Sequence, residues 1–258
     1  MTAEDDNSAQ ELIDLSSEIT GNAAVAAIGF LVAGPVGAMA GAFSGPAIAK
    51  TIKLVAKEIN DRFLAKREKI RIGATLNYAA QKIQQRLDAG DQIRQDDFFN
   101  FEASARPPAE EILEGVLIAS QKEHEEKKLE FYGNLVANLA FDSSYSLQEA
   151  NYLLKVAQNL TYQQLCLLSL FGRSVHGLRK TDYRGQGEFD TKLISLLQEI
   201  YELSSLGMLN CSGEVLFSLT DVNPGKIKVQ GTGEFLLKLM ELGSIDIDEL
   251  TPLAVRLT

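Results

Sequence analysis

The sequence is poor in the residues that build cross-links and metal centres. It has 258 residues, with no tryptophan, two cysteines and two histidines. Cys166 and Cys211 are too few and too far apart in sequence for a disulfide framework or a zinc site. Cys166 lies in an apolar run, QLCLLSLF, which predicts a buried and reduced thiol. We therefore expect a protein of a reducing compartment, the cytoplasm.

The motifs of enzyme active sites are also lacking. His124 and Glu125 are followed by EKK, so the sequence contains no HExxH zinc motif there. Nothing around His124 or His176 supports a Ser-His-Asp arrangement. The glycine-rich part of the chain has no GK[ST] and is not a phosphate-binding loop. The sequence therefore predicts a non-enzyme, with no catalytic residue, no metal ligand and no cofactor.

Positive charge is scarce. The chain has 25 lysines and arginines against 35 aspartates and glutamates, a formal net charge of -10. Surfaces that bind nucleic acid are basic because they neutralise phosphates. This balance disfavours nucleic acid as the main partner, while leaving room for a local basic face. The length suffices for one large or two modest domains, each with a buried core.

Between Gly21 and Ala49 charge is absent altogether: GNAAVAAIGFLVAGPVGAMAGAFSGPAIA. An apolar stretch of about 18 or more residues is long enough to cross a bilayer. Small residues spaced by four also let two helices approach closely in a membrane. Pro35 and Pro46 are expected to divide the stretch into a hairpin or two half-helices. The glycines expected to mediate membrane contact or oligomerisation are Gly29, Gly34, Gly37, Gly41 and Gly45.

A buried hairpin in a soluble helical bundle is the alternative for this stretch, because strongly hydrophobic side chains are few in it. The flanking charges favour the membrane: acidic residues precede the stretch and basic residues follow it. The positive-inside tendency would keep the following body in the cytoplasm. The cations expected to contact lipid headgroups or another anionic partner are Lys50, Lys53, Lys57, Arg62, Lys66 and Arg67.

Hydrophobic periodicity predicts a mainly α fold with a helical N-terminal body and a helical hairpin at 21–49. We divide the chain into an acidic segment 1–20, the Gly/Ala-rich segment 21–49, a helical domain 50–158 and a C-terminal domain 159–258. The pattern is helical from Ala47 to about Ala89 and from 109 to 141, with HEEKK as a solvated turn. Most glutamates there are expected on a solvated face: Glu110, Glu111, Glu114, Glu123, Glu125, Glu126 and Glu130.

Between these helices lies a connector, 88–108. It contains a DAGD turn and a helix start signal at Pro107-Pro108. Its aromatic patch, Phe98, Phe99 and Phe101, is interpreted as satellite core under a loop, the alternative being a docking patch for a partner or membrane. Further on, Ser146 and Glu149 form the pattern of a helix capping box.

The C-terminal domain combines helices with a short hairpin. Helices are predicted from Thr161 to Gly172, from Thr191 to about Gly207, and over GTGEFLLKLMEL. EVLFSLTDV and KIKVQ alternate as strands do, and Asn223-Pro224-Gly225 between them has turn chemistry. The residues from 172 to 187 are expected to form a loop.

This order resembles the winged helix of MarR-type regulators, on LTYQQLCLLSLF, ELSSLGMLN and VNPGKIKVQGTGEFLLKLM. The resemblance implies that the helix 191–205 would enter the DNA major groove. That helix offers one basic residue against two acidic ones, so reuse as a protein-contact module is the favoured interpretation. The cations that would contact DNA are Arg179, Lys180, Lys226 and Lys228.

The Gly/Ala-rich segment resembles the glycine-zipper segments of pore-forming toxins, holins and membrane-acting effectors of bacterial antiphage systems. The resemblance implies a conditional membrane effector that assembles with copies of itself, contacts inner-membrane lipids and senses a protein partner through its C-terminal domain. Two other functions stay open: a DNA-binding transcriptional regulator and a soluble helical adaptor.

Overall fold

The computed structural model describes residues 51–52, 54–55, 64–100, 106–173, 177–211 and 216–258. The Gly/Ala-rich segment and its glycines lie outside these residues. The chain divides into two compact units, Met1–Gln158 and Asn159–Thr258. The fold is mainly helical with one two-stranded antiparallel sheet in the described part, which confirms the predicted mainly α class. Of the helices described, none combines the length and apolarity needed to cross a membrane.

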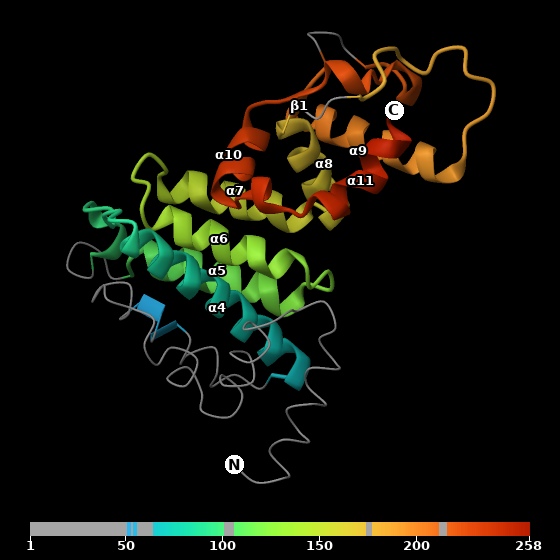
Figure 1. Cartoon of the computed structure of the whole chain (residues 1–258). Coiled ribbons are helices and arrows are strands. Elements are labelled where there is room, and N and C mark those ends of the chain that lie inside the picture. The colour runs from blue at the N-terminus through green and yellow to red at the C-terminus, as the bar shows by residue number, and fades with distance from the viewer. Residues whose placement is uncertain (1–50, 53, 56–63, 101–105, 174–176, 212–215) are drawn as a thin grey trace. The chain divides into compact units, whose positions relative to one another are not determined.

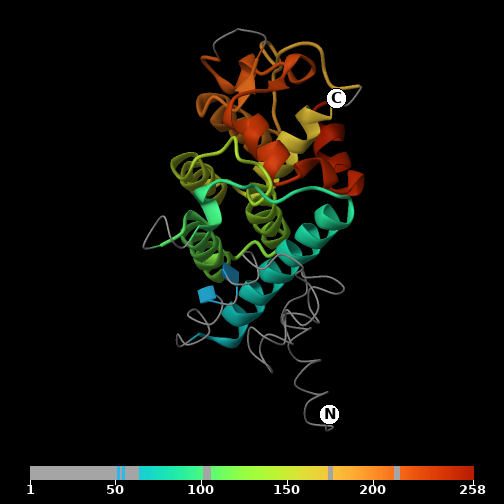
Figure 2. The same ribbon diagram turned by 90° about the vertical axis from the view of Figure 1, so that its left-hand side faces the viewer.

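The N-terminal unit is built on α4 (Lys66–Asp88), α5 (Pro108–Lys122), α6 (Lys128–Leu139) and α7 (Leu147–Asn159). Figures 1 and 2 show α4 lying beside α5 and α6. The apolar residues of α4 recur at helical spacing, and the face that they form is buried between α5 and α6. The core of the unit therefore lies where these three helices meet.

The predicted continuous helix from Ala47 to Ala89 is wrong at one point, because the backbone is not helical at Leu64 and Ala65. Ala65 is extended, and its N–H donates to Glu68 Oε2 at 2.7 Å. The Glu68 carboxylate thereby satisfies one of the amides that a helix N-terminus leaves without a partner. Hence α4 begins anew at Lys66, after the helical residues 51–52 and 54–55.

Gly133 lies where α6 crosses α4. A Cβ built at Gly133 would be 2.9 Å from Thr75 O and 2.9 Å from Ala79 N, both backbone atoms of α4. Nearby, the buried Thr75 Oγ1 donates to Ser120 Oγ at 2.9 Å, which joins α4 to α5. The absence of a side chain at position 133 therefore sets how closely α4 and α6 approach.

The connector is held against the end of α6 by Arg94. The Arg94 guanidinium donates to Leu139 O at 3.3 Å and to Tyr145 O at 3.1 Å, and stacks on the Phe98 ring at 4.2 Å. Phe98 lies in η1 (Asp97–Phe99) and is buried, which confirms the satellite-core interpretation for that residue. Phe101 lies outside the described residues.

Two local predictions at helix starts are confirmed. Helix α5 begins at Pro108, as the Pro-Pro signal predicted. Before α7, the Ser146 N–H donates to Glu149 Oε2 at 2.8 Å, and the Glu149 N–H donates to Ser146 Oγ at 3.3 Å. These two bonds form the predicted capping box.

In the C-terminal unit α8 (Tyr162–Gly172) is the central helix. Every residue from Gln164 to Phe171 is buried, Cys166 included, which confirms the predicted buried thiol. A helix that is apolar all round needs neighbours on every side. Around it lie α9 (Thr191–Ser205), β2 (Lys228–Val229), α10 (Thr232–Leu239), η4 (Leu242–Ser244) and α11 (Ile247–Arg256).

Of the predicted β-hairpin, KIKVQ supplies a strand, β2 (Lys228–Val229), but that strand pairs with Leu209–Asn210 and not with the described part of EVLFSLTDV. β1 (Leu209–Asn210) pairs antiparallel with β2, with Leu209 opposite Val229. EVLFSLTDV is not a strand in its described part, because η2 (Leu219–Asp221) follows an irregular stretch. Asn223-Pro224-Gly225 does not close a tight hairpin, since Pro224–Lys226 forms the 3-10 turn η3. The Asp221 carboxylate accepts the Phe217 and Ser218 amides, which turns the chain away from an extended strand.

We expect Gly133→Ala to destabilise the N-terminal unit by roughly 1–3 kcal/mol. The gain in helix propensity, about 1 kcal/mol, is smaller than the cost of pushing two packed backbones apart. Thermal and urea unfolding followed by circular dichroism measures the change. Gly187→Ala is the matched control because no atom lies within 4 Å of its added Cβ. Equal stability of the two variants would contradict the close crossing.

Candidate functional site

A cluster of charged side chains lies where the turn between α5 and α6 meets the first turns of α4. The turn covers Glu123 to Lys127 and overlaps the HEEKK run, 124–128, for which a solvated turn was predicted. The solvated-face prediction is wrong for Glu123 and Glu126, and the solvated-turn prediction is wrong for Lys128, because all three are buried. We call these residues, with Arg67, Arg71 and Tyr132, the ion cluster.

Glu123 and Lys128 form the inner half of the cluster. Lys128 Nζ lies 2.6 Å from Glu123 Oε2, and the Tyr132 hydroxyl donates to the same oxygen at 2.8 Å. The Glu125 N–H donates to Glu123 Oε1 at 3.0 Å. Burial raises the pKa of the Glu123 carboxyl, but the bonds from Lys128, the Glu125 amide and Tyr132 outweigh it and hold this pKa below its usual range. Glu123 is therefore held as a carboxylate.

Glu126 forms the outer half and connects the turn to α4. Its Oε1 accepts from Arg67 Nε at 2.8 Å and from Arg71 Nε at 3.1 Å. The Glu126 side chain is 1% exposed and that of Arg67 is 48% exposed, so the pair spans the edge of the core. No described residue donates to Glu126 Oε2, which is buried. A carboxylate removed from water is stable only when cations compensate it, and here two arginines of α4 do so.

Two further bonds fix the start of α4 to the end of α5. Arg71 Nη1 donates to Gln121 O at 3.4 Å, and Gln121 Nε2 donates to Glu68 Oε1 at 3.2 Å. Glu68 also caps α4 through Ala65. The first turns of α4 are therefore held by contacts with the end of α5 as well as with the α5–α6 turn.

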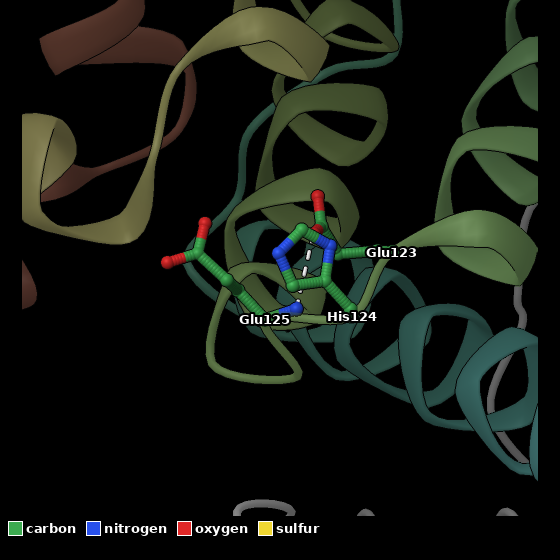
Figure 3. Close-up of side chains that lie close together, drawn as sticks. All are labelled: Glu123, His124 and Glu125. Atoms are coloured by element: carbon green, nitrogen blue, oxygen red, sulfur yellow. Dashed lines mark hydrogen bonds and ion pairs between the residues drawn. The ribbon is translucent and has the colours of Figure 1, made fainter.

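One group in the described part of the chain brings three metal-ligand side chains within 4.8 Å of one another: Glu123, His124 and Glu125 (Figure 3). Two features weaken it as a metal site. Glu123 already binds the Lys128 ammonium, and the His124 side chain is 88% exposed. The dashed line in Figure 3 marks the hydrogen bond that the Glu125 backbone N–H donates to Glu123 Oε1, and this bond fixes the turn. Lys128 supplies the positive charge beside Glu123 that a metal ion would otherwise supply.

The residues expected at the membrane are only partly among those described. Lys50, Lys53, Lys57 and Arg62 lie outside the described residues, as do the five glycines. Lys66 is exposed at the first position of α4. Arg67 serves an internal contact with Glu126, while half of its side chain stays exposed.

The four cations expected to contact DNA are in the C-terminal unit, and the structure separates their roles. Lys180, Lys226 and Lys228 are exposed. Arg179 instead holds a loop together: its guanidinium donates to Asp182 O at 3.0 Å and to Gln186 Oε1 at 3.2 Å, and lies 4.4 Å from the Tyr183 ring. The exposed face of α9 carries Lys192 and Glu202 and little other charge.

Sequence reasoning missed the ion cluster for a physical reason. Arg67 and Arg71 lie one helical turn apart in a basic run, and Glu126 is more than 50 residues further along the chain. No local pattern distinguishes Glu126 from the exposed glutamates near it. The sequence does offer one signal: apolar residues that are buried in the structure, Ala119 and Leu129, lie on either side of the turn and bring it close to the core.

Comparison of the chain with protein-family models, with curated proteins and with solved structures found no match.

We expect Glu126→Gln to destabilise the N-terminal unit by about 2–3 kcal/mol, because Arg71 loses a buried counter-ion. The loss is smaller than for a fully buried pair, since Arg67 can turn to water. Chemical denaturation measures it. The control is His124→Gln, two residues away and exposed, which should leave stability unchanged. If Glu126→Gln leaves the free energy of unfolding unchanged, the ion cluster does not hold α4.

Asp221 is expected to make the stability of the C-terminal unit depend on acid pH. The Arg184 guanidinium at 2.7 Å and the amides of Phe217 and Ser218 lower the pKa of Asp221 to about 2, below its value of about 3.9 in an unfolded chain. A lowered pKa stabilises the fold above pH ~4, and this contribution is lost as pH falls towards 2. Unfolding measured from pH 6 to 2 should therefore be less pH-dependent in Asp221→Asn than in the parent or in the exposed control Glu188→Gln.

Proposed function

We propose that this protein is a non-enzymatic bacterial effector that acts on membranes. The observation that carries the proposal is the uncharged stretch from Gly21 to Ala49, in a chain of which 23% is charged. A stretch of this length without charge needs either lipid or an apolar protein surface around it. The effector resides in the cytoplasm and associates conditionally with the inner membrane, where copies assemble through the glycines. Antiphage defence or toxicity towards the producing cell is the process that fits such an activity.

The ion cluster supports a conditional mechanism. It ties the start of α4 to the α5–α6 turn, so the body remains a rigid anchor while the segment before it changes partner. In the sequence, the basic residues from Lys50 to Lys66 stand between the segment and the ion cluster, and they would meet anionic headgroups once the segment is in lipid. Each basic residue near an anionic surface contributes about 1 kcal/mol. A weakly hydrophobic segment is then held by charge as well as by apolar burial.

The C-terminal unit is proposed to contact a protein partner. Several of its large apolar side chains are exposed: Phe217 at 84%, Leu206 at 59% and Ile194 at 44%. Exposed aromatic and aliphatic residues are typical of protein contact surfaces. Such a partner would supply the trigger.

Binding of duplex DNA receives less support from the same unit. The lysines at 180, 226 and 228 are exposed, which is the observation in its favour. Against it, Arg179 is engaged inside its own loop, and the face of α9 that would read bases presents Glu202 as well as Lys192. A base-reading helix offers Arg, Lys, Asn or Gln to base edges and phosphates.

We expect the triple variant Gly37→Leu, Gly41→Leu, Gly45→Leu to lose oligomer formation and membrane permeabilisation. Leucine side chains would hold apart the helix backbones that small residues let approach. Flotation with anionic vesicles, dye release and cross-linking measure binding, leakage and assembly separately.

The matched control replaces the same three glycines with alanine, which keeps the small-residue face. It should retain most of the leakage and assembly. If the parent protein does not float with anionic vesicles and does not assemble, the membrane function is wrong, and a soluble adaptor becomes the better description. Leakage that is equal in the leucine and alanine variants would exclude the glycine face as its cause.

A further inference from the structure

The N-terminal unit contains an apolar cavity of about 30 Å³ beside the first residues that the structure describes. Its walls come from four parts of the unit: α4, the η1 connector, α5 and α6. Thr51 and Ile52 complete it. Two of the lining residues, Phe99 and Val136, are only half-buried.

Water does not suit this cavity. A buried water needs about two to four polar partners, and among the described lining residues only Thr51 has a polar side chain. The Thr51 side chain is itself buried, and its Oγ1 has no hydrogen-bond partner among the described residues. A buried hydroxyl without a partner costs about 1–3 kcal/mol. The natural occupant is therefore apolar, and brings a polar group for the hydroxyl of Thr51.

A polypeptide segment meets both requirements, since it carries apolar side chains and a backbone carbonyl at every residue. An acyl chain offers no such group along its length. The segment 21–49 ends two residues before Thr51, and each residue of chain spans at most about 3.6 Å. Its side chains from Val36 to Ile48 are thus within reach of the cavity. Val36, Phe43 and Ile48 are the branched and aromatic side chains in that part.

We propose that, in the resting state, residues 21–49 pack against the cavity lined by Ile52, Phe99 and Val136, and that this contact hides them from lipid. The inference rests on the proposed membrane function and adds to it the surface that masks the segment. The mask is assembled from the same helices that the ion cluster holds together. Release of the segment exposes its apolar side chains and leaves the cavity open.

Cysteine pairs test the contact in the full-length protein. A disulfide forms only when the two Cα atoms come within about 7 Å of each other. Val136→Cys supplies the wall, and single cysteine substitutions of Val32, Val36, Ala40 and Phe43 scan the segment. The matched wall control is Gln81→Cys, an exposed position on α4. The native cysteines are buried, and peptide mass mapping distinguishes their bonds from the engineered ones.

The proposal expects mild oxidation of the Val136→Cys variants to join the wall to at least one segment position within a single chain. The Gln81→Cys variants should form no such bond. The locked protein should fail to float with anionic vesicles, and reduction should restore flotation.

Three results would overturn the proposed contact, the membrane function, or both. If the Val136→Cys variants form no bond to the segment, or if the bonds join two chains, residues 21–49 of the same chain are not the occupant. An intrachain bond in a protein that never binds vesicles would keep the contact and remove the membrane function. Vesicle binding by a protein that forms no such bond would keep the membrane function and remove the proposed contact.

Discussion

The arrangement of the N-terminal unit depends on one buried carboxylate. Glu126 projects from the turn between α5 and α6, and it is stable there because Arg67 and Arg71 of α4 compensate its charge. The helices could pack their apolar faces at several rotations with similar burial, since apolar contact is not directional. The two arginines favour a rotation and register that bring both guanidinium groups to the same Glu126 oxygen. The ion cluster therefore holds the first turns of α4 in place against the α5–α6 turn.

Close backbone packing complements this electrostatic contact. At Gly133 the backbones of α6 and α4 approach so closely that no side chain fits between them. The polar contact of Thr75 with Ser120 adds a directional bond within the same core. The C-terminal unit follows a different principle, because its central helix α8 is apolar on all sides and is enclosed by its neighbours. There the ion pair of Arg184 with Asp221 joins a loop before α9 to a residue after it, and Arg179 holds its own loop through Asp182 O and Gln186 Oε1.

A conditional membrane effector needs a body that does not unfold when the segment attached to it exchanges one partner for another. The contacts described above are suited to that demand. Packed backbones and compensated buried charges resist opening. In the proposed mechanism, the apolar cavity, with a Thr51 hydroxyl that has no partner among the described residues, is the place where the segment binds and from which it is released. In the proposed function, the ion cluster and the close helix packing keep the body folded, and the contact at the cavity is the one that is made and broken.

Sequence by itself determined the mainly α class, the burial of Cys166 and the helix start signals at Pro108 and Ser146, because periodicity and capping depend on residues within one or two turns. It also determined the uncharged stretch on which the proposed function rests. Only the tertiary structure decided that Glu123, Glu126 and Lys128 are buried, that the helix breaks before Lys66, and that the C-terminal strands are two residues long. Each of these depends on a partner distant in sequence or on a side chain that bonds the backbone. A charged side chain is buried only where the fold places a counter-ion beside it. Local sequence does not show this for Glu126, because more than 50 residues separate it from Arg71.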